Sequence, residues 1–238
     1  MSSMGYYYGY GLDPTYILVL IGAVLCIWAQ MRVQSTYKKY ARIRSRSGLT
    51  GAQAAQRILQ LSGIYDVSIE HVRGELTDHY DPSHKVLRLS DTVYGSDSIA
   101  AIGVAAHECG HAVQHDKGYA PLSFRTALVP VANIGSRIGI PIILLGAIMG
   151  MNQMLIQIGI WVFSLAVLFQ IVTLPVEFNA SGRALAMLGN YGMLEQDETR
   201  NCRKVLSAAA LTYVAAAAAS ILQLLRLILL FGNGRRRD

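Results

Sequence analysis

The sequence has few charged residues for its length. Of the 238 residues, only 15% are charged and 53% are hydrophobic, whereas soluble domains average about 25% charged residues. This shortage argues against a large soluble core and favours contact with lipid. The first long apolar run, Leu12 to Met31, has about the 20 residues that a helix needs to cross a bilayer.

Cysteine is also scarce. Cys26, Cys109 and Cys202 lie far apart in the chain, so they do not form the framework of a disulfide-rich secreted domain and suit a reducing compartment. The segment before the first apolar run contains no Lys or Arg, and no small-residue cleavage site follows the run. We therefore expect a retained membrane anchor and not a cleaved signal peptide.

Acidic residues are missing between Arg32 and Gly63, a segment that carries seven basic residues. A basic segment can neutralise nucleic-acid phosphates, but Lys and Arg also accumulate on the cytoplasmic side of membrane spans. Because the basic segment begins where the first apolar run ends, we interpret it as a topological signal and expect no nucleic-acid partner. It places the N-terminus outside and the chain from residue 34 onward in the cytoplasm.

Three further apolar segments predict membrane helices at 127–150, 154–174 and 205–231. Only a few residues separate the first two, which predicts an antiparallel hairpin that leaves the cytoplasmic face and returns to it. The basic residues at 235–237 conflict with an outside C-terminus, so the side of the C-terminus is left open.

The polar region between the first two spans predicts a small α+β unit. A helix is expected from Thr50, its N-cap, to about Gly63. Residues 67–89 alternate apolar and polar side chains around a cluster of turn residues, which predicts a β-hairpin. A second helix is expected to begin at Ser96 or Asp97 and to end near Gly118.

This second helix carries the pattern H-E-x-x-H, formed by His107, Glu108 and His111. Four residues turn a helix by about 400°, so the two imidazoles emerge about 40° apart and about 6 Å apart along the axis. They can therefore bind one zinc ion at the usual distance of about 2 Å. Glu108 is adjacent and does not ligate; it is the candidate general base toward water activated by the zinc.

A third ligand must come from elsewhere in the chain. His115 lies about 12 Å along the helix from His107, too far to share an ion, so we interpret it as a surface residue or a neighbour of the ligands. A catalytic zinc with two histidines usually takes a carboxylate, and Glu177 follows the third span closely, after Pro175, which is expected to open a new helix. Small residues at 180, 181 and 184 would let that helix pack against the motif helix. An interfacial or capping role is the alternative for Glu177.

Several segments together resemble the YugP-like membrane zinc metallopeptidases. They are "STYKKY", "LTDHYDPSHKVLRLSDTVY", "AAIGVAAHECGHAVQH", "TLPVEFNASGRAL" and "CRKVLSAAALTYVAAA". The layout is also similar to that of HtpX-type gluzincins, in which a membrane hairpin separates the H-E-x-x-H helix from a Glu-bearing helix. The resemblance implies one zinc per chain, Glu177 as third ligand, and proteolysis at a bacterial cytoplasmic membrane. In those relatives Asp typically follows the Glu four residues later, whereas this chain has Ser181.

The expected fold is a mainly α polytopic membrane protein with about four transmembrane helices and a small α+β cytoplasmic, zincin-like metallopeptidase domain. The predicted function is that of a zinc-dependent endopeptidase with its active site at the cytoplasmic face, acting on polypeptides, including membrane or misfolded proteins. The alternatives are a non-catalytic membrane protein with a structural zinc site closed by Cys109 or His115, and a transporter or scaffold. The predicted parts are an anchor and first span (1–33), a cytoplasmic domain (34–126), a transmembrane hairpin (127–174), a helix with the third ligand (175–204) and a C-terminal hydrophobic helix with a basic tail (205–238).

The residue that stabilises the transition-state oxyanion is not distinguished by the sequence. Its candidates are His71, His79, His84, Tyr80, Tyr119 and Arg183. By analogy with gluzincins, residues 85–89 are expected to be the strand edge along which a peptide adds. Cys109 is expected to pack in the core. The physiological substrate, the depth of cleavage relative to the membrane and the oligomeric state are left open.

Overall fold

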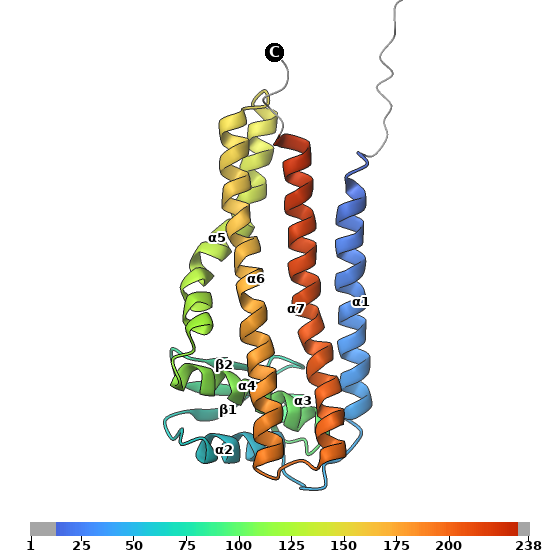
Figure 1. Ribbon diagram of the computed structural model, residues 1–238, viewed down its shortest axis with the longest axis vertical. Helices are drawn as coiled ribbons and strands as arrows, with labels where there is room; N and C mark the ends of the chain where they lie inside the picture. The colour runs from blue at the N-terminus through green and yellow to red at the C-terminus, as the bar shows by residue number, and fades with distance from the viewer. Residues whose placement is uncertain (1–12, 233–238) are drawn as a thin grey trace, which may run out of the picture.

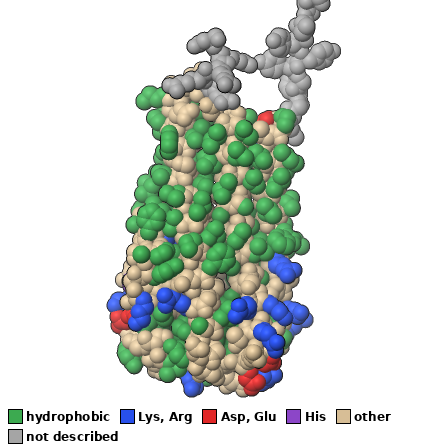
Figure 2. Space-filling model, in the orientation of Figure 1, with side chains coloured by type: hydrophobic (Ala, Val, Ile, Leu, Met, Phe, Trp, Pro, Cys, Tyr) green, Lys and Arg blue, Asp and Glu red, His purple; other side chains and the backbone are tan. Residues whose placement is uncertain are grey.

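Four long helices stand side by side, and a small sheet with three shorter helices lies at one end of them (Figure 1). The computed structural model describes residues 13–232. The long helices are α1 (Tyr16–Tyr40), α5 (Ala120–Ile148), α6 (Gln153–Asn190) and α7 (Gln196–Phe231), and each is long and apolar enough to cross a membrane. The four predicted spans are therefore confirmed as helices. Apolar side chains cover this part of the surface, and Lys and Arg gather near its lower end (Figure 2).

The long helices pack in the spatial order α5, α6, α7 and α1. The first residues of α1, the turn between α5 and α6, and the last residues of α7 all lie at the end opposite the sheet (Figure 1). The predicted tight connection between the second and third spans is present, since only four residues separate α5 from α6. All four helices therefore direct their other ends toward the sheet and its short helices.

The sheet contains β1 (Ser68–Val72), β2 (His79–Asp81) and β3 (Val86–Ser90) in the order β1-β3-β2. The predicted hairpin over 67–89 is wrong in its pairing, because β1 runs parallel to β3 and only β2 is antiparallel to β3. The reason is burial: four of the five residues of β3 are buried, while β1 is largely exposed. A strand buried to this extent occupies the centre of a sheet.

The three shorter helices are α2 (Gly51–Leu61), α3 (Asp91–Tyr94) and α4 (Ile99–Asp116). A capping box between Thr50 and Gln53 begins α2, and the left-handed backbone of Gly63 follows its end, as predicted. The helix α4 begins one or two residues later than predicted, because the Ser98 hydroxyl accepts the N–H of Ala101. Around α4, the core gathers side chains of the sheet, α2, α6 and α7.

Two predicted boundaries fall inside continuous helices. No new helix begins at Pro175, because α6 runs unbroken from Gln153 to Asn190 with this proline in its interior. A proline removes one backbone hydrogen bond from a helix, and here the flanking residues Thr173 and Val176 are buried and Gln114 of α4 donates to the carbonyl of Val176. Similarly, α7 begins at Gln196 and includes the polar residues before 205. The segment that carries Glu177 is therefore a direct continuation of the third apolar helix.

Candidate metal centre

Three potential metal ligands converge where α4 crosses α6. The Nε2 atoms of His107 and His111 lie 3.2 and 3.5 Å from Oε2 of Glu177. The three ligand atoms all lie within 4.8 Å of one another, and the Glu177 side chain is only 3% exposed. The structure thus brings together the residues that the sequence proposed as a ligand set.

The convergence depends on a close approach of the two helices at Gly110. A Cβ atom at this position would lie 2.5 Å from the carbonyl oxygen of Ala180, a separation that real Cβ contacts do not allow. Ala180 and Ala184 are both fully buried, in agreement with the prediction that small residues after Glu177 pack against the motif helix. Small residues on both helices therefore bring the Glu177 backbone near enough for its carboxylate to reach the imidazoles.

Hydrogen bonds on the far side of each imidazole fix its orientation. Gln114 is fully buried, and its Nε2 donates to the carbonyl of Val176 at 2.8 Å and to Oδ1 of Asn179 at 3.0 Å. Its Oε1 therefore faces Nδ1 of His111 at 3.0 Å and accepts that N–H. Oγ of Ser181 lies 3.1 Å from Nδ1 of His107. Such outer partners hold metal-binding histidines in one tautomer, and Ser181 provides one at the position where Asp is expected from the HtpX-type layout.

The donor set fits a cation. Oε2 of Glu177 is buried and has no hydrogen-bond partner among the described residues. Because His111 donates from Nδ1 to Gln114, the neutral imidazole carries its lone pair on Nε2. This lone pair faces Oε2 of Glu177. Burial alone would lower the pKa of His111, but the neighbouring carboxylates of Glu177 and Glu108 raise it above its usual value. Two imidazole nitrogens and a carboxylate oxygen are ligands that zinc prefers.

Glu108 lies beside this cluster and is not part of it. Its carboxylate is mostly buried and accepts the backbone N–H of Tyr80, on β2, at 3.0 Å. Together with His107 it lines a cavity of about 270 Å³ between α1, α4 and α7. The partly buried Asp78 lines the same cavity. Its partial burial raises the pKa of its carboxyl, and its hydrogen bonds to Ser90 oppose that shift.

Two residues that lie near the cluster, Arg125 and Tyr213, were not identified from the sequence. Nη2 of Arg125 lies 3.9 Å from Oε1 of Glu177, so the two carboxylate oxygens face a cation on one side and the imidazoles on the other. Tyr213 lines the cavity beside His107 and Glu108. Two sequence signals point to Tyr213: it lies in the segment "CRKVLSAAALTYVAAA" that resembles the family, and it is a polar side chain within an apolar span, where such residues often serve function.

The other candidates have partners away from the cluster. His115 is exposed, and its Nδ1 lies 2.8 Å from the hydroxyl of Tyr80, whose pKa burial raises to about 12. None of the six oxyanion candidates lines the cavity that contains Glu108. Their contacts are His71 with Asp91, His84 with Asp81, His79 with the carbonyl of Thr77, Tyr80 with His115, Arg183 with Asn179, and Tyr119 beneath the guanidinium of Arg183.

Cys109 is fully buried in the core, as predicted. Its Sγ lies 3.7 Å from the carbonyl of Ala55 on α2, and burial raises the pKa of the thiol well above its usual value. Zinc binds the thiolate and not the thiol. Within residues 13–232, neither Cys109 nor His115 joins the group of three potential ligands.

Comparison with known proteins gives matches over nearly the whole chain. The model of a family described as "Putative neutral zinc metallopeptidase" matches residues 15–232. The chain is similar to the "Putative membrane protease YugP" of Bacillus subtilis (strain 168), with 49% identity over 221 residues, which are 92% of this chain and 98% of the relative. No solved structure matches.

Proposed function

The chain belongs to the family of neutral zinc metallopeptidases, and we propose that it is a membrane-embedded endopeptidase that hydrolyses peptide bonds in polypeptides. The observation that carries this proposal is the convergence of three ligand atoms at a cavity that both His107 and Glu108 line. Membership of this family and the four apolar helices indicate a zinc-dependent membrane protein. We further propose the endopeptidase reaction and the roles of single residues.

In the proposed site, His107, His111 and Glu177 hold the zinc. When bound, zinc acts as a Lewis acid and lowers the pKa of a coordinated water to about 7. Glu108 is the general base that accepts a proton from the attacking water and then delivers it to the leaving amine. The N–H of Tyr80, which donates to Glu108, holds the carboxylate in place at the cavity wall.

The number of ligands favours catalysis over a structural role. Structural zinc sites are usually closed by four protein ligands, whereas catalytic sites use three and keep one position for water or substrate. The group found in residues 13–232 contains three. This count supports the enzyme over the alternative of a non-catalytic membrane protein with a structural zinc.

We expect the substrate to bind along β2. The sequence instead predicted residues 85–89 as the strand edge for the substrate. That expectation is wrong, because β3 is the central strand and pairs on both sides. The strand β2 lies at an edge of the sheet and contacts α4, and Tyr80 at its centre already donates an N–H toward the site. An extended peptide added at this edge would place its backbone beside Glu108.

We place the site at the cytoplasmic face of the cell membrane, since the basic residues near the sheet end follow the positive-inside rule. Labelling of single cysteines with a membrane-impermeant maleimide tests this orientation in intact cells, in a Cys26→Ala background. Gln60→Cys, exposed on α2, should be labelled only after lysis. Gln153→Cys, exposed at the opposite end on α6, should be labelled in intact cells. The reverse pattern would show that the site faces outward.

Removal of the metal tests the enzyme function. The purified chain in neutral detergent should cleave an unfolded protein substrate, should lose this activity on treatment with a zinc chelator, and should regain it on addition of one equivalent of zinc. The loss should reach about 100-fold or more, because acid–base assistance by Glu108 is useful only when water is held beside it. Undiminished cleavage by the zinc-free chain would contradict the proposal.

A further inference from the structure

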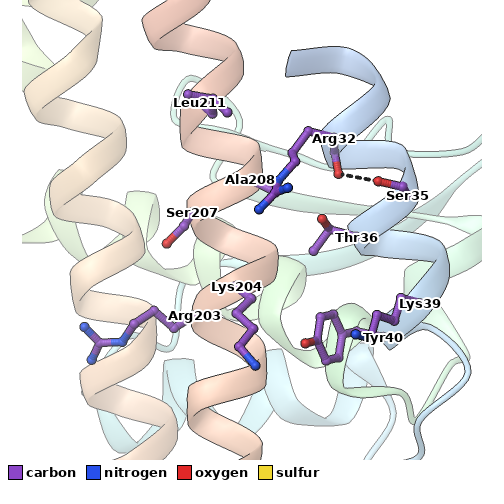
Figure 3. A pocket seen from close by; sticks show the side chains of 10 residues that line it. All are labelled: Arg32, Ser35, Thr36, Lys39, Tyr40, Arg203, Lys204, Ser207, Ala208 and Leu211. Carbon is purple, nitrogen blue, oxygen red and sulfur yellow. Dashed lines mark hydrogen bonds between the residues drawn. The ribbon is translucent and has the colours of Figure 1, made fainter. Parts of the chain in front are cut away.

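A groove between α1 and α7 collects basic side chains at the sheet end of the two helices. It has a volume of about 690 Å³, within the range of small-molecule sites. Figure 3 shows Arg32 and Thr36 of α1 and Lys204 of α7 around the space between the helices, with Lys39 and Tyr40 at its lower end. The lining residues are Arg32, Ser35, Thr36, Lys39, Tyr40, Arg203, Lys204, Ser207, Ala208 and Leu211.

The cations of this groove are not neutralised by the protein. No carboxylate lines the groove, and within residues 13–232 no ion pair includes Arg32, Lys39 or Lys204. By contrast, the nearby Arg46 is paired, with Asp197 at 2.9 Å. The protein therefore carries a local excess of positive charge between two helices that are far apart in the sequence.

The ammonium groups are brought together on one aromatic ring. Nζ of Lys39 lies 5.5 Å, and Nζ of Lys204 lies 5.9 Å, from the ring centroid of Tyr40. The ring attracts each cation, but two like charges that share it repel each other. An anion bound between them would relieve this repulsion and would link α1 to α7.

The location of the groove indicates the source of the anion. It lies where the apolar part of α1 ends, and the preceding turns of α1 expose large apolar side chains, with Trp28 at 51% and Met31 at 65%. Lys and Arg follow the lower margin of the apolar surface in Figure 2. Leu211 and Ala208 continue the lining along α7. A ligand that is anionic at one end and apolar at the other would match both parts.

We propose that this groove binds the phosphate headgroup of an anionic phospholipid, with the acyl chains along α1 and α7. Guanidinium and ammonium groups bind phosphate oxygens, and basic pockets between membrane helices near the cytoplasmic surface suit such headgroups. Thr36 and Ser207 add hydroxyl groups at the groove. The bound lipid holds the α1–α7 pair together at the end where both helices border the Glu108 cavity.

Two double variants with equal charge test the proposal. Arg32→Gln with Lys204→Gln removes two cations from the groove, and Lys38→Gln with Arg200→Gln removes two exposed cations from the same helices outside it. Native mass spectrometry of the full chain in neutral detergent would measure the binding of phosphatidylglycerol and phosphatidylcholine. We expect wild type and the control variant to retain one phosphatidylglycerol. The groove variant should bind it about tenfold more weakly or worse, since each cation near an anionic lipid contributes about a fivefold gain, and phosphatidylcholine should bind weakly to all three.

Two further measurements complete the test. Thr36→Trp fills the groove and leaves every charge in place, so it should also lose the lipid. Inorganic phosphate at millimolar concentration should not displace phosphatidylglycerol; if it does, the natural ligand is a soluble phosphate and the lipid assignment is wrong. Equal lipid affinity in the groove and control variants, or lipid retention by Thr36→Trp, would likewise overturn the proposal.

Discussion

Replacement of Glu177 by Gln should lower the zinc affinity of the chain by more than about 100-fold. Changes to the outer partners of zinc ligands alone cost about 10- to 100-fold, and loss of an anionic ligand should cost more. Both imidazole nitrogens approach Oε2 of Glu177, which has no hydrogen-bond donor of its own among the described residues. A neutral amide has no negative charge to attract the zinc, and only one of its two terminal atoms, the carbonyl oxygen, could bind the metal.

The choice of Gln over Ala protects the fold in this test. Arg125 faces the other carboxylate oxygen of Glu177, so truncation to Ala would leave a half-buried guanidinium beside an empty space. Removal of one partner of a buried ion pair is strongly destabilising. The amide keeps the volume and a carbonyl oxygen that can face Arg125.

The control is His115→Ala, which removes an exposed imidazole from the same helix. It should bind zinc as the wild type does, because His115 contacts Tyr80 and not the ligand cluster. Zinc affinity is measured by competition with a chelating dye. Full affinity in Glu177→Gln would exclude Glu177 as a ligand, and an equal loss in His115→Ala would show that the effect is not specific to the cluster.

Local patterns were sufficient to predict much of this protein. Four long apolar runs specify four helices because a bilayer requires a fixed length of apolar chain. The spacing of His107 and His111 specifies that both imidazoles leave one face of a helix. The small residues after Glu177 correctly indicated close packing, which the structure achieves between Gly110 and Ala180.

The remaining features depend on contacts between distant segments. The pairing of β1 with β3 follows from the burial of β3, and alternation of residue types alone does not distinguish a parallel neighbour from a hairpin partner. The helix α6 continues through Pro175 where Val176 and Glu177 are buried and Gln114 of α4 donates to the carbonyl of Val176. Arg125 and Tyr213 reach the site because α5 and α7 stand beside α6, a neighbourhood that the pattern of apolar runs does not specify.

Replacement of Glu108 by Gln should abolish most peptide cleavage while the zinc is retained. The amide cannot accept a proton from the attacking water or pass one to the leaving amine, and such acid–base assistance contributes about 10²- to 10⁴-fold to the rate. The fold should be preserved, because the amide oxygen can still accept the N–H of Tyr80 that Glu108 now accepts at 3.0 Å. Glu75→Gln makes the same chemical change at an exposed position outside the cavity and should cleave at the wild-type rate.

The most direct test of the proposed peptidase is therefore a paired measurement on one preparation of each protein: the rate of cleavage of an unfolded protein substrate and the zinc content per chain. We expect wild type and Glu75→Gln to show full activity with one zinc. Glu108→Gln should contain one zinc and cleave at least about 100-fold more slowly. Cleavage at the wild-type rate by zinc-loaded Glu108→Gln would contradict the assignment of Glu108 as general base, and loss of zinc from this variant would contradict its placement outside the ligand set.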